Sequence, residues 1–197
     1  SGECVVALDL DGTLIPMLVD FNGLRVRVRA ILGVDHPLKP LAESLARLVV
    51  GGESKELAWR LIEEEEVRSV ERLDPGELAE NSEFVRRLLS LGVEVVFVTA
   101  RSSRSAELVL SKLGLANIAK AVITRDSTPF RVEQLKQAKA LAGGRKVVFV
   151  GDTQHDEESA RSLGVDFVMV GSYRELPSTL GRVVDACAQA GGAAGDR

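Results

Sequence analysis

Five short apolar runs along the chain predict buried β-strands, at residues 4–8, 93–98, 121–124, 146–150 and 166–170. Within each run the apolar residues are nearly continuous and do not alternate with polar ones. This pattern is typical of parallel strands that are covered by helices on both faces of a sheet. The sequence therefore predicts a parallel sheet with two buried faces.

Apolar residues recur with helical spacing between and after the later runs. The predicted helices cover residues 77–91, 103–113, 131–141, 155–163 and about 178–188. Gly114, Gly143 and Gly164 stand where three of these helices are expected to end, since glycine readily adopts the backbone conformation that closes a helix. Strands that alternate with helices predict an α/β fold with a doubly wound parallel sheet and a Rossmann-like core.

A long interval after the first strand breaks this alternation. It contains helical signals near residues 21–32, 41–50 and 54–73 but no convincing strand. Leu24 to Arg29 alternates apolar and basic residues as a strand does, but its flanks favour a helix. The acidic run from Glu63 to Glu66 is typical of a solvated helix face.

These patterns divide the chain into two units. We predict an α/β core made of residues 1–14 and 76–197 and an inserted helical cap at residues 15–75. The glycine- and alanine-rich residues 191–197 are expected to form a flexible tail.

Charge and composition limit the possible partners. The formal net charge of −4 and the pI near 5.4 provide no basic surface for nucleic acid or an anionic membrane. No apolar segment reaches the length of about 20 residues that spans a bilayer, and no signal pattern begins the chain, so we expect a cytoplasmic protein. Cys4 and Cys187 are far apart and lack metal-ligand spacing, which predicts unpaired thiols.

Polar residues follow three of the predicted strands directly. Ligands of an open parallel sheet bind outside the carboxyl ends of its strands, so these residues are expected to meet at one edge. Two adjacent buried carboxylates require a cation or hydrogen-bond donors nearby. The residues are Asp9 and Asp11 after the first strand, Thr99, Ala100 and Arg101 after the second, and Asp152 to Asp156 after the fourth.

These residues resemble a known family. Asp9-Leu10-Asp11-Gly12-Thr13, Thr99, and Gly151-Asp152 with Asp156 are similar to the first, second and fourth motifs of the haloacid dehalogenase-like hydrolase superfamily, most of whose members are phosphatases. The resemblance covers residues 4–14 and 83–170. The inserted helices also resemble the helical cap that many members carry between the first and second motifs.

The resemblance implies a role for each motif residue. Asp9 would be the nucleophile that forms an aspartyl-phosphate, and Asp11 the general acid and then the general base. The resemblance further implies that Thr99 and the Ala100 backbone N–H bind the substrate's phosphoryl oxygens. Arg101, the next residue after the second strand, is a further candidate for substrate binding. A Mg²⁺ ion would be held by Asp9, Asp152 and the Asp11 backbone carbonyl, with Asp156 assisting at the same metal site.

The third motif of the family, a lysine at the start of the helix before the fourth strand, is missing. We predict that Arg131 supplies this catalytic positive charge, although an arginine differs from a lysine in reach and shape. Lys136, Lys139 and Arg125 are the other candidates. Lys136 and Lys139 lie about 7.5 and 12 Å further along the predicted helix.

The leading hypothesis is therefore a Mg²⁺-dependent phosphatase for a small phosphorylated metabolite, with the cap closing over the substrate. Arg25, Arg29 and Arg101 are candidates for contact with a remote anionic group. A phosphoryl-transferring mutase of the same fold is an open alternative. A non-catalytic binding or regulatory protein is another, and the missing lysine is its main support.

Overall fold

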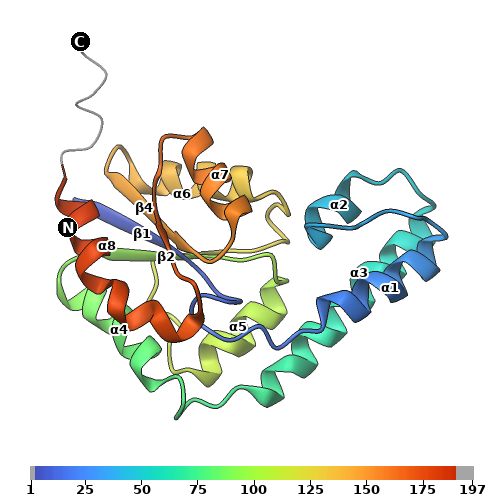
Figure 1. Cartoon of the computed structure of the whole chain (residues 1–197), viewed down its shortest axis with the longest axis horizontal. Coiled ribbons are helices and arrows are strands. Elements are labelled where there is room, and N and C mark those ends of the chain that lie inside the picture. The colour runs from blue at the N-terminus through green and yellow to red at the C-terminus, as the bar shows by residue number, and fades with distance from the viewer. Residues whose placement is uncertain (1–2, 190–197) are drawn as a thin grey trace.

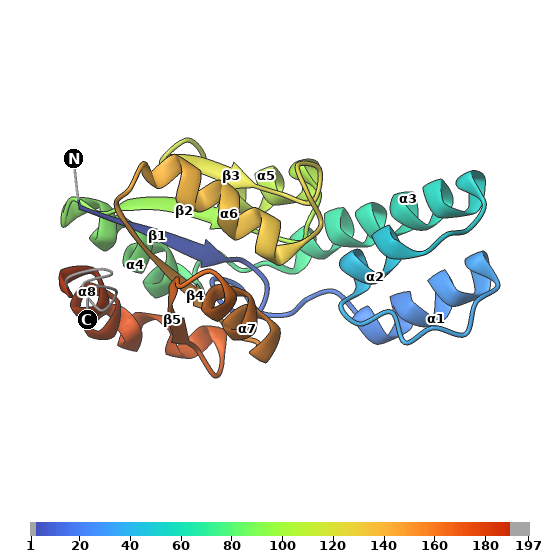
Figure 2. The ribbon, with the colours of Figure 1, turned by 90° about the horizontal axis from the view of Figure 1, so that it is seen from above.

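A computed structural model describes residues 3–189, so the predicted tail at 191–197 lies outside the described residues. Its central sheet has five parallel strands in the order β3-β2-β1-β4-β5 (Figure 2). The strands are β1 (Cys4–Asp9), β2 (Glu94–Val98), β3 (Ala121–Ile123), β4 (Lys146–Gly151) and β5 (Asp166–Met169). The predicted parallel α/β fold is confirmed, with strand ends that differ by about a residue.

Helices cover both faces of the sheet (Figure 1). On one face lie α4 (Ala79–Ser90), α5 (Ser103–Lys112) and α8 (Leu180–Ala188), and on the other lie α6 (Arg131–Ala142) and α7 (Gln154–Ser162). Val5 and Ala7 pack into one layer, whereas Val6 and Leu8 pack into the other, and all four are fully buried. Continuous burial explains why β1 has no polar alternation.

The last predicted helix, at residues 178–188, differs at its start. A 3₁₀ segment, η2 (Tyr173–Thr179), comes first, and α8 begins only at Leu180. Pro177 lies inside η2 and has no backbone N–H to donate, which explains why a regular α-helix begins after it.

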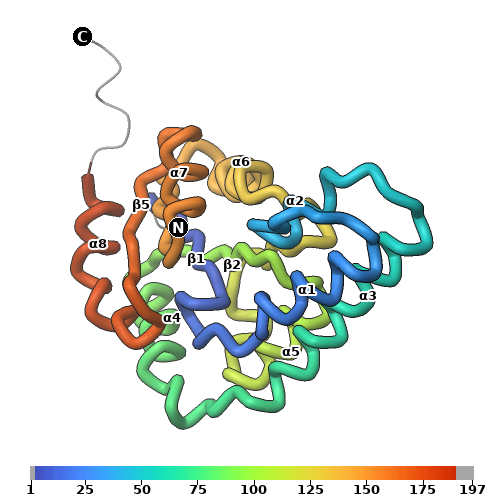
Figure 3. Tube along the Cα trace, turned by 45° about the vertical axis from the view of Figure 1, so that its right-hand side comes forward, coloured from blue at the N-terminus to red at the C-terminus, as the bar shows by residue number. Residues whose placement is uncertain are grey.

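Residues 15–75, which we call the cap, contain α1 (Phe21–Leu32), α2 (Leu41–Arg47) and α3 (Gly52–Ser69), with η1 (Val70–Arg72) at their end. Helices α1 and α3 run side by side (Figure 3). Their buried residues, among them Leu24, Val28 and Ile62, form a hydrophobic cluster separate from the two clusters of the sheet. The stretch from Leu24 to Arg29 is helical because Leu24 and Val28, four residues apart, share the buried face.

Cys4 and Cys187 form a disulfide bond, so the prediction of unpaired thiols is wrong. Cys4 begins β1, and Cys187 lies in α8, which packs against β1. Their Cα atoms are 5.5 Å apart, a separation that suits a disulfide. The packing of α8 against β1 brings together two cysteines that are 183 positions apart in the sequence. Their spacing along the sequence does not indicate that they pair.

Reduction of this disulfide is expected to lower the melting temperature. The bond closes a long loop and restricts the unfolded chain, an effect of about 2–4 kcal/mol, or about 4–16 °C for a chain of this length. Thermal unfolding with and without a reductant measures the effect. Cys187→Ser should melt at the lower temperature in both conditions. Two titratable thiols in the folded, oxidised wild type would contradict the assignment.

Among residues 3–189, no helix is both long and apolar enough to cross a membrane.

Candidate active site

A cavity of about 460 Å³ lies between the carboxyl ends of the strands and the cap. This volume suits a small molecule. The core contributes Ala100 and a set of acidic and basic residues to its walls, and the charged ones include Asp9, Asp11, Arg101, Arg125, Arg131, Asp152 and Asp156. The cap contributes mainly apolar residues together with Arg25, Lys39, Glu43 and Glu66.

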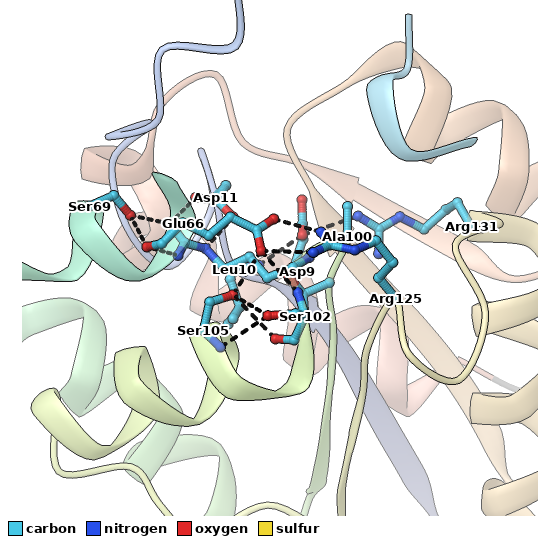
Figure 4. Close-up of polar contacts among 12 residues, drawn as sticks. Asp9, Leu10, Asp11, Glu66, Ser69, Ala100, Ser102, Ser105, Arg125 and Arg131 are labelled. Carbon is cyan, nitrogen blue, oxygen red and sulfur yellow. Dashed lines mark hydrogen bonds and ion pairs between the residues drawn. The ribbon is translucent and has the colours of Figure 1, made fainter. Parts of the chain in front are cut away.

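Asp9 ends β1 and is buried at the floor of the cavity. Its Oδ1 accepts hydrogen bonds from the Leu10 backbone N–H at 2.8 Å and from Arg131 Nη2 at 3.1 Å (Figure 4). Burial raises the pKa of Asp9 well above its usual value, and the Asp156 and Asp152 carboxylates add to this effect while Arg131 opposes it. The deprotonated form of Asp9 therefore depends on nearby positive charge.

Arg131 supplies part of that charge, and the structure places it at the predicted position. It begins α6, and its side chain is only 9% exposed. Its Nε donates to Asp156 at 3.0 Å and its Nη2 to Asp9. Burial acts to lower the pKa of Arg131, but the Asp9 and Asp156 carboxylates reverse this effect and raise it, so the guanidinium stays charged.

The other cations that the sequence offered lie elsewhere. Lys136 is 53% exposed and pairs with Glu133. Lys139 donates to the Leu163 carbonyl, and Arg125 pairs with Glu66 of the cap. Of these four candidates, Arg131 is the one that contacts the Asp9 carboxylate.

Gln134 was not predicted from the sequence. It lies one turn after Arg131 on α6, and its Oε1 accepts a hydrogen bond from Arg131 Nη1 at 2.8 Å. Its Nε2 donates to the carbonyls of Thr99 and Thr128, at 2.8 and 2.9 Å. Gln134 thus joins Arg131 to the loop after β2. Its spacing of three residues from Arg131 was the available signal.

Asp9, Asp152 and Asp156 form an acidic cluster that suits a metal ion. One carboxylate oxygen from each lies within 4.8 Å of the others. Hard cations such as Mg²⁺ prefer this all-oxygen donor set. Burial raises the pKa of Asp152, and the Asp156 charge contributes, which is another sign that the cluster lacks positive charge.

Local backbone structure brings these acids together. Gly12 has a φ of +79°, and a Cβ atom at this position would lie 2.1 Å from an Asp152 carboxylate oxygen. A side chain at residue 12 would therefore displace the Asp152 carboxylate from its position in the cluster. Thr13 Oγ1 also donates to Asp152 Oδ1 at 3.3 Å. The glycine and threonine of the first motif thus make room for Asp152 and orient it.

Asp156 has a different environment from Asp152. Its carboxylate accepts from Arg131 and also from the Thr153 backbone N–H, in a capping box at the start of α7. Asp156 therefore both caps α7 and belongs to the acidic cluster. These contacts leave Asp156 less free than Asp152 to bind a metal ion directly.

The Asp11 side chain lies outside the acidic cluster of Asp9, Asp152 and Asp156. Its two carboxylate oxygens accept hydrogen bonds from Arg101 Nε at 2.8 Å and Nη2 at 2.9 Å. Arg101, predicted to bind substrate, lines the cavity but is 2% exposed and directs these donors at Asp11.

Thr99 and Ala100 form the turn after β2. Thr99 is fully buried, and its Oγ1 accepts a hydrogen bond from the Arg101 backbone N–H at 3.0 Å. The hydroxyl therefore stabilises the loop in this state, and Thr99 is not among the residues that line the cavity. Ala100 does line it, while its carbonyl accepts from Arg125 at 2.6 Å.

Glu66 contradicts the prediction that residues 63–66 form a solvated face. It is 2% exposed and accepts two hydrogen bonds from Arg125, at 2.7 and 3.1 Å. The Ser102 backbone N–H and the Ser105 hydroxyl donate to the same carboxylate. Ile62, four residues earlier, is also buried, so helical spacing from an apolar neighbour was the only signal.

His155 and Arg25 also line the cavity. His155 is partly exposed and pairs with Glu43 of α2, and its hydrogen bond to the Glu43 carboxylate raises the pKa of His155. Arg25 lines the cavity, and its Nε donates to the Leu38 carbonyl at 2.9 Å. Arg29 donates to the His36 carbonyl and is not among the lining residues.

The family model for haloacid dehalogenase-like hydrolases matches residues 5–164, and the chain belongs to this family. The chain is 28% identical over 191 residues to the phosphoglycolate phosphatase of Rhodobacter capsulatus, covering 86% of this chain and 85% of that protein. The predicted enzyme class, a phosphatase of this family, is therefore confirmed.

Solved structures agree with the fold. A hydrolase from Pseudomonas syringae has a TM-score of 0.64 at 17% identity, covering 94% of this chain and 99% of that one. A haloacid dehalogenase-like family protein from Streptococcus pneumoniae has a TM-score of 0.58 at 16% identity, covering 92% and 96%.

Proposed function

We propose that this phosphatase is Mg²⁺-dependent and hydrolyses a small phosphorylated metabolite through an aspartyl-phosphate at Asp9. The observation that carries the proposal is the buried contact of Asp9 with Arg131 beside Asp152 and Asp156, at the floor of a small cavity. Asp9 and Asp152 would hold the ion, with the Asp11 carbonyl as the implied third protein ligand. When bound, Mg²⁺ reduces the repulsion between the acidic site and the phosphate.

The reaction would proceed in two displacements. First, an Asp9 carboxylate oxygen forms a bond to phosphorus, the bond from phosphorus to the alcohol oxygen breaks, and Asp11 gives its proton to that oxygen. Second, a water oxygen bonds to phosphorus while the bond to Asp9 breaks. Asp11 takes a proton from the water, and inorganic phosphate and the Asp9 carboxylate are released. Arg131 keeps positive charge beside Asp9 in both displacements.

The cavity supports a small, acidic substrate. Its volume of about 460 Å³ suits a small molecule and leaves room for more than the phosphate group. Arg25 and Lys39 of the cap also line the cavity and would attract a second anionic group. Since the curated relative is a phosphoglycolate phosphatase, 2-phosphoglycolate and similar phosphorylated acids are the first compounds to test.

The alternatives have less support. The non-catalytic hypothesis rested on the missing lysine, and Arg131 occupies the place next to Asp9 that such a lysine would need. A mutase would share the first displacement. In its second displacement a substrate hydroxyl, in place of water, would attack phosphorus.

A panel of small phosphate esters, assayed with Mg²⁺, with EDTA and after Mg²⁺ is restored, tests the proposal. We expect phosphate release from at least one phosphorylated acid, a loss of about 100-fold or more with EDTA, and recovery with Mg²⁺. A phosphorylated product in place of free phosphate would favour the mutase. Failure of every ester together with no Mg²⁺ binding by calorimetry would favour the non-catalytic protein.

A further inference from the structure

Arg101 makes contacts that the proposed reaction does not yet use. Its guanidinium grips both oxygens of Asp11, at 2.8 and 2.9 Å. A two-point contact of this kind fixes the plane of a carboxylate as well as its position. The Asp11 carboxylate is thus held in a single orientation at the edge of the cavity.

The same guanidinium is fixed from the other side by the cap. Arg101 Nη1 donates to the Glu66 carbonyl at 3.1 Å, and Nη2 donates to Ser69 Oγ at 3.0 Å. Both acceptors belong to the last turns of α3 (Figure 4). The Glu66 side chain holds this part of α3 to the core through Arg125 and Ser102.

These contacts argue against Arg101 as a substrate ligand. It is 2% exposed, and Nε, Nη1 and Nη2 all donate to protein acceptors. Binding a phosphate would require Arg101 to give up Asp11 or α3. By contrast, an ionised carboxylate has about four lone-pair sites, so Asp11 can accept a further hydrogen bond while Arg101 holds it.

We propose that Arg101 is a positioning residue, which orients the Asp11 carboxylate toward the water of the second displacement. Because Arg101 also donates hydrogen bonds to helix α3, this orientation of Asp11 depends on the position of α3 in the cap. The inference rests on the proposed function. In that displacement the water oxygen bonds to phosphorus, the phosphorus–Asp9 bond breaks, and the water proton passes to Asp11. Loss of Arg101 leaves the Asp11 carboxylate free to rotate, and the second displacement slows.

A substrate with a good leaving group separates the two displacements. The nitrophenolate of p-nitrophenyl phosphate departs without a proton, so the first displacement does not need Asp11. For Arg101→Met we expect a burst of about one nitrophenolate per active site, followed by turnover about 100-fold slower than in wild type. Acid-quenched Arg101→Met should carry more covalent phosphate at steady state than wild type does.

Three further variants are compared with Arg101→Met. Arg68→Met makes the same substitution at an arginine that is 58% exposed and pairs with Glu65, and it should behave as wild type. Ser69→Ala removes one anchor of Arg101 and should slow steady-state turnover by a few-fold, with the burst intact. Arg101→Lys can contact Asp11 at one point, so its turnover should lie between those of wild type and Arg101→Met.

Arg101→Met with wild-type turnover would overturn the inference. So would a parallel loss of burst and turnover in a variant whose melting temperature is unchanged, since the first displacement would then need Arg101. If Arg101→Met does not fold, Arg101→Lys decides: slower turnover with a full burst supports the inference, and wild-type turnover overturns it. A wild type that forms no covalent phosphate contradicts the proposed function itself.

Discussion

Replacement of Asp9 by asparagine is expected to abolish phosphate release while the protein remains folded. The amide has nearly the shape of the carboxylate and retains an oxygen for the Leu10 backbone N–H, a contact of 2.8 Å. It is, however, a poor nucleophile for phosphorus. Loss of a covalent nucleophile typically lowers kcat by about 10⁴- to 10⁶-fold. Phosphate release from the best substrate of the panel, with the melting temperature measured in parallel, checks this result.

Covalent labelling gives a second measurement of the same prediction. Wild type quenched during turnover of a labelled substrate should carry acid-stable, hydroxylamine-sensitive phosphate, and Asp9→Asn should carry none. Asp185→Asn is the matched control, because Asp185 is exposed on α8, away from the cavity. Full turnover by Asp9→Asn would exclude Asp9 as the nucleophile.

The sequence predicted the fold well where burial alone determines which residues are apolar. Residues Val5 to Leu8 are all apolar because both faces of β1 are covered, and the pattern follows directly from that burial. The position of Asp9 then follows from the end of the strand. The prediction of Arg131 rests instead on the resemblance, which implies a cation at the start of the helix before the fourth strand, and α6 begins at Arg131.

The contacts that depend on packing between distant elements could not be predicted. Glu66 belongs to an acidic run that also contains the partly exposed Glu65, and its helical spacing from Ile62 is the only local signal that separates the two. Its burial depends on how α3 approaches α5 and on Arg125 at the end of β3. Arg101 was expected to bind substrate because it follows a strand, but the position of Asp11, 90 residues away, decides where its guanidinium points.

The buried charge of Arg131 contributes more to the function of the site than to the stability of the fold. Removal of a guanidinium from water is unfavourable, and its pairs with Asp9 and Asp156 offset this penalty. Three carboxylates remain around one arginine, and the pKa of Asp9 stays raised by burial. These four side chains together therefore carry an excess of negative charge, which a bound cation would neutralise. A site optimised for stability alone would have an apolar residue at position 131 and no buried acids.

Replacement of Arg131 by methionine is expected to lower kcat/KM by about 100- to 1000-fold, since the thioether side chain would fill the space without neutralising Asp9. Because Arg131 opposes the rise in the pKa of Asp9, its loss moves that pKa further upward. The nucleophile must be deprotonated, so the acidic limb of kcat/KM against pH should shift to higher pH. Lys136→Met, a change on the exposed side of the same helix, should leave both the rate and the pH profile unchanged.

Arg131→Met is also expected to lose about 3–5 kcal/mol of stability, because two buried carboxylates lose their partner. Arg131→Lys retains a charge, so it should be more stable and more active than Arg131→Met, with the acidic limb nearer to that of wild type. We therefore expect stability and activity to fall from wild type to Arg131→Lys to Arg131→Met. If Arg131 only filled space, the two variants would instead rank by side-chain volume, and the pH profile would not change. Wild-type rates for Arg131→Met, or a strong loss for Lys136→Met, would place the required cation elsewhere.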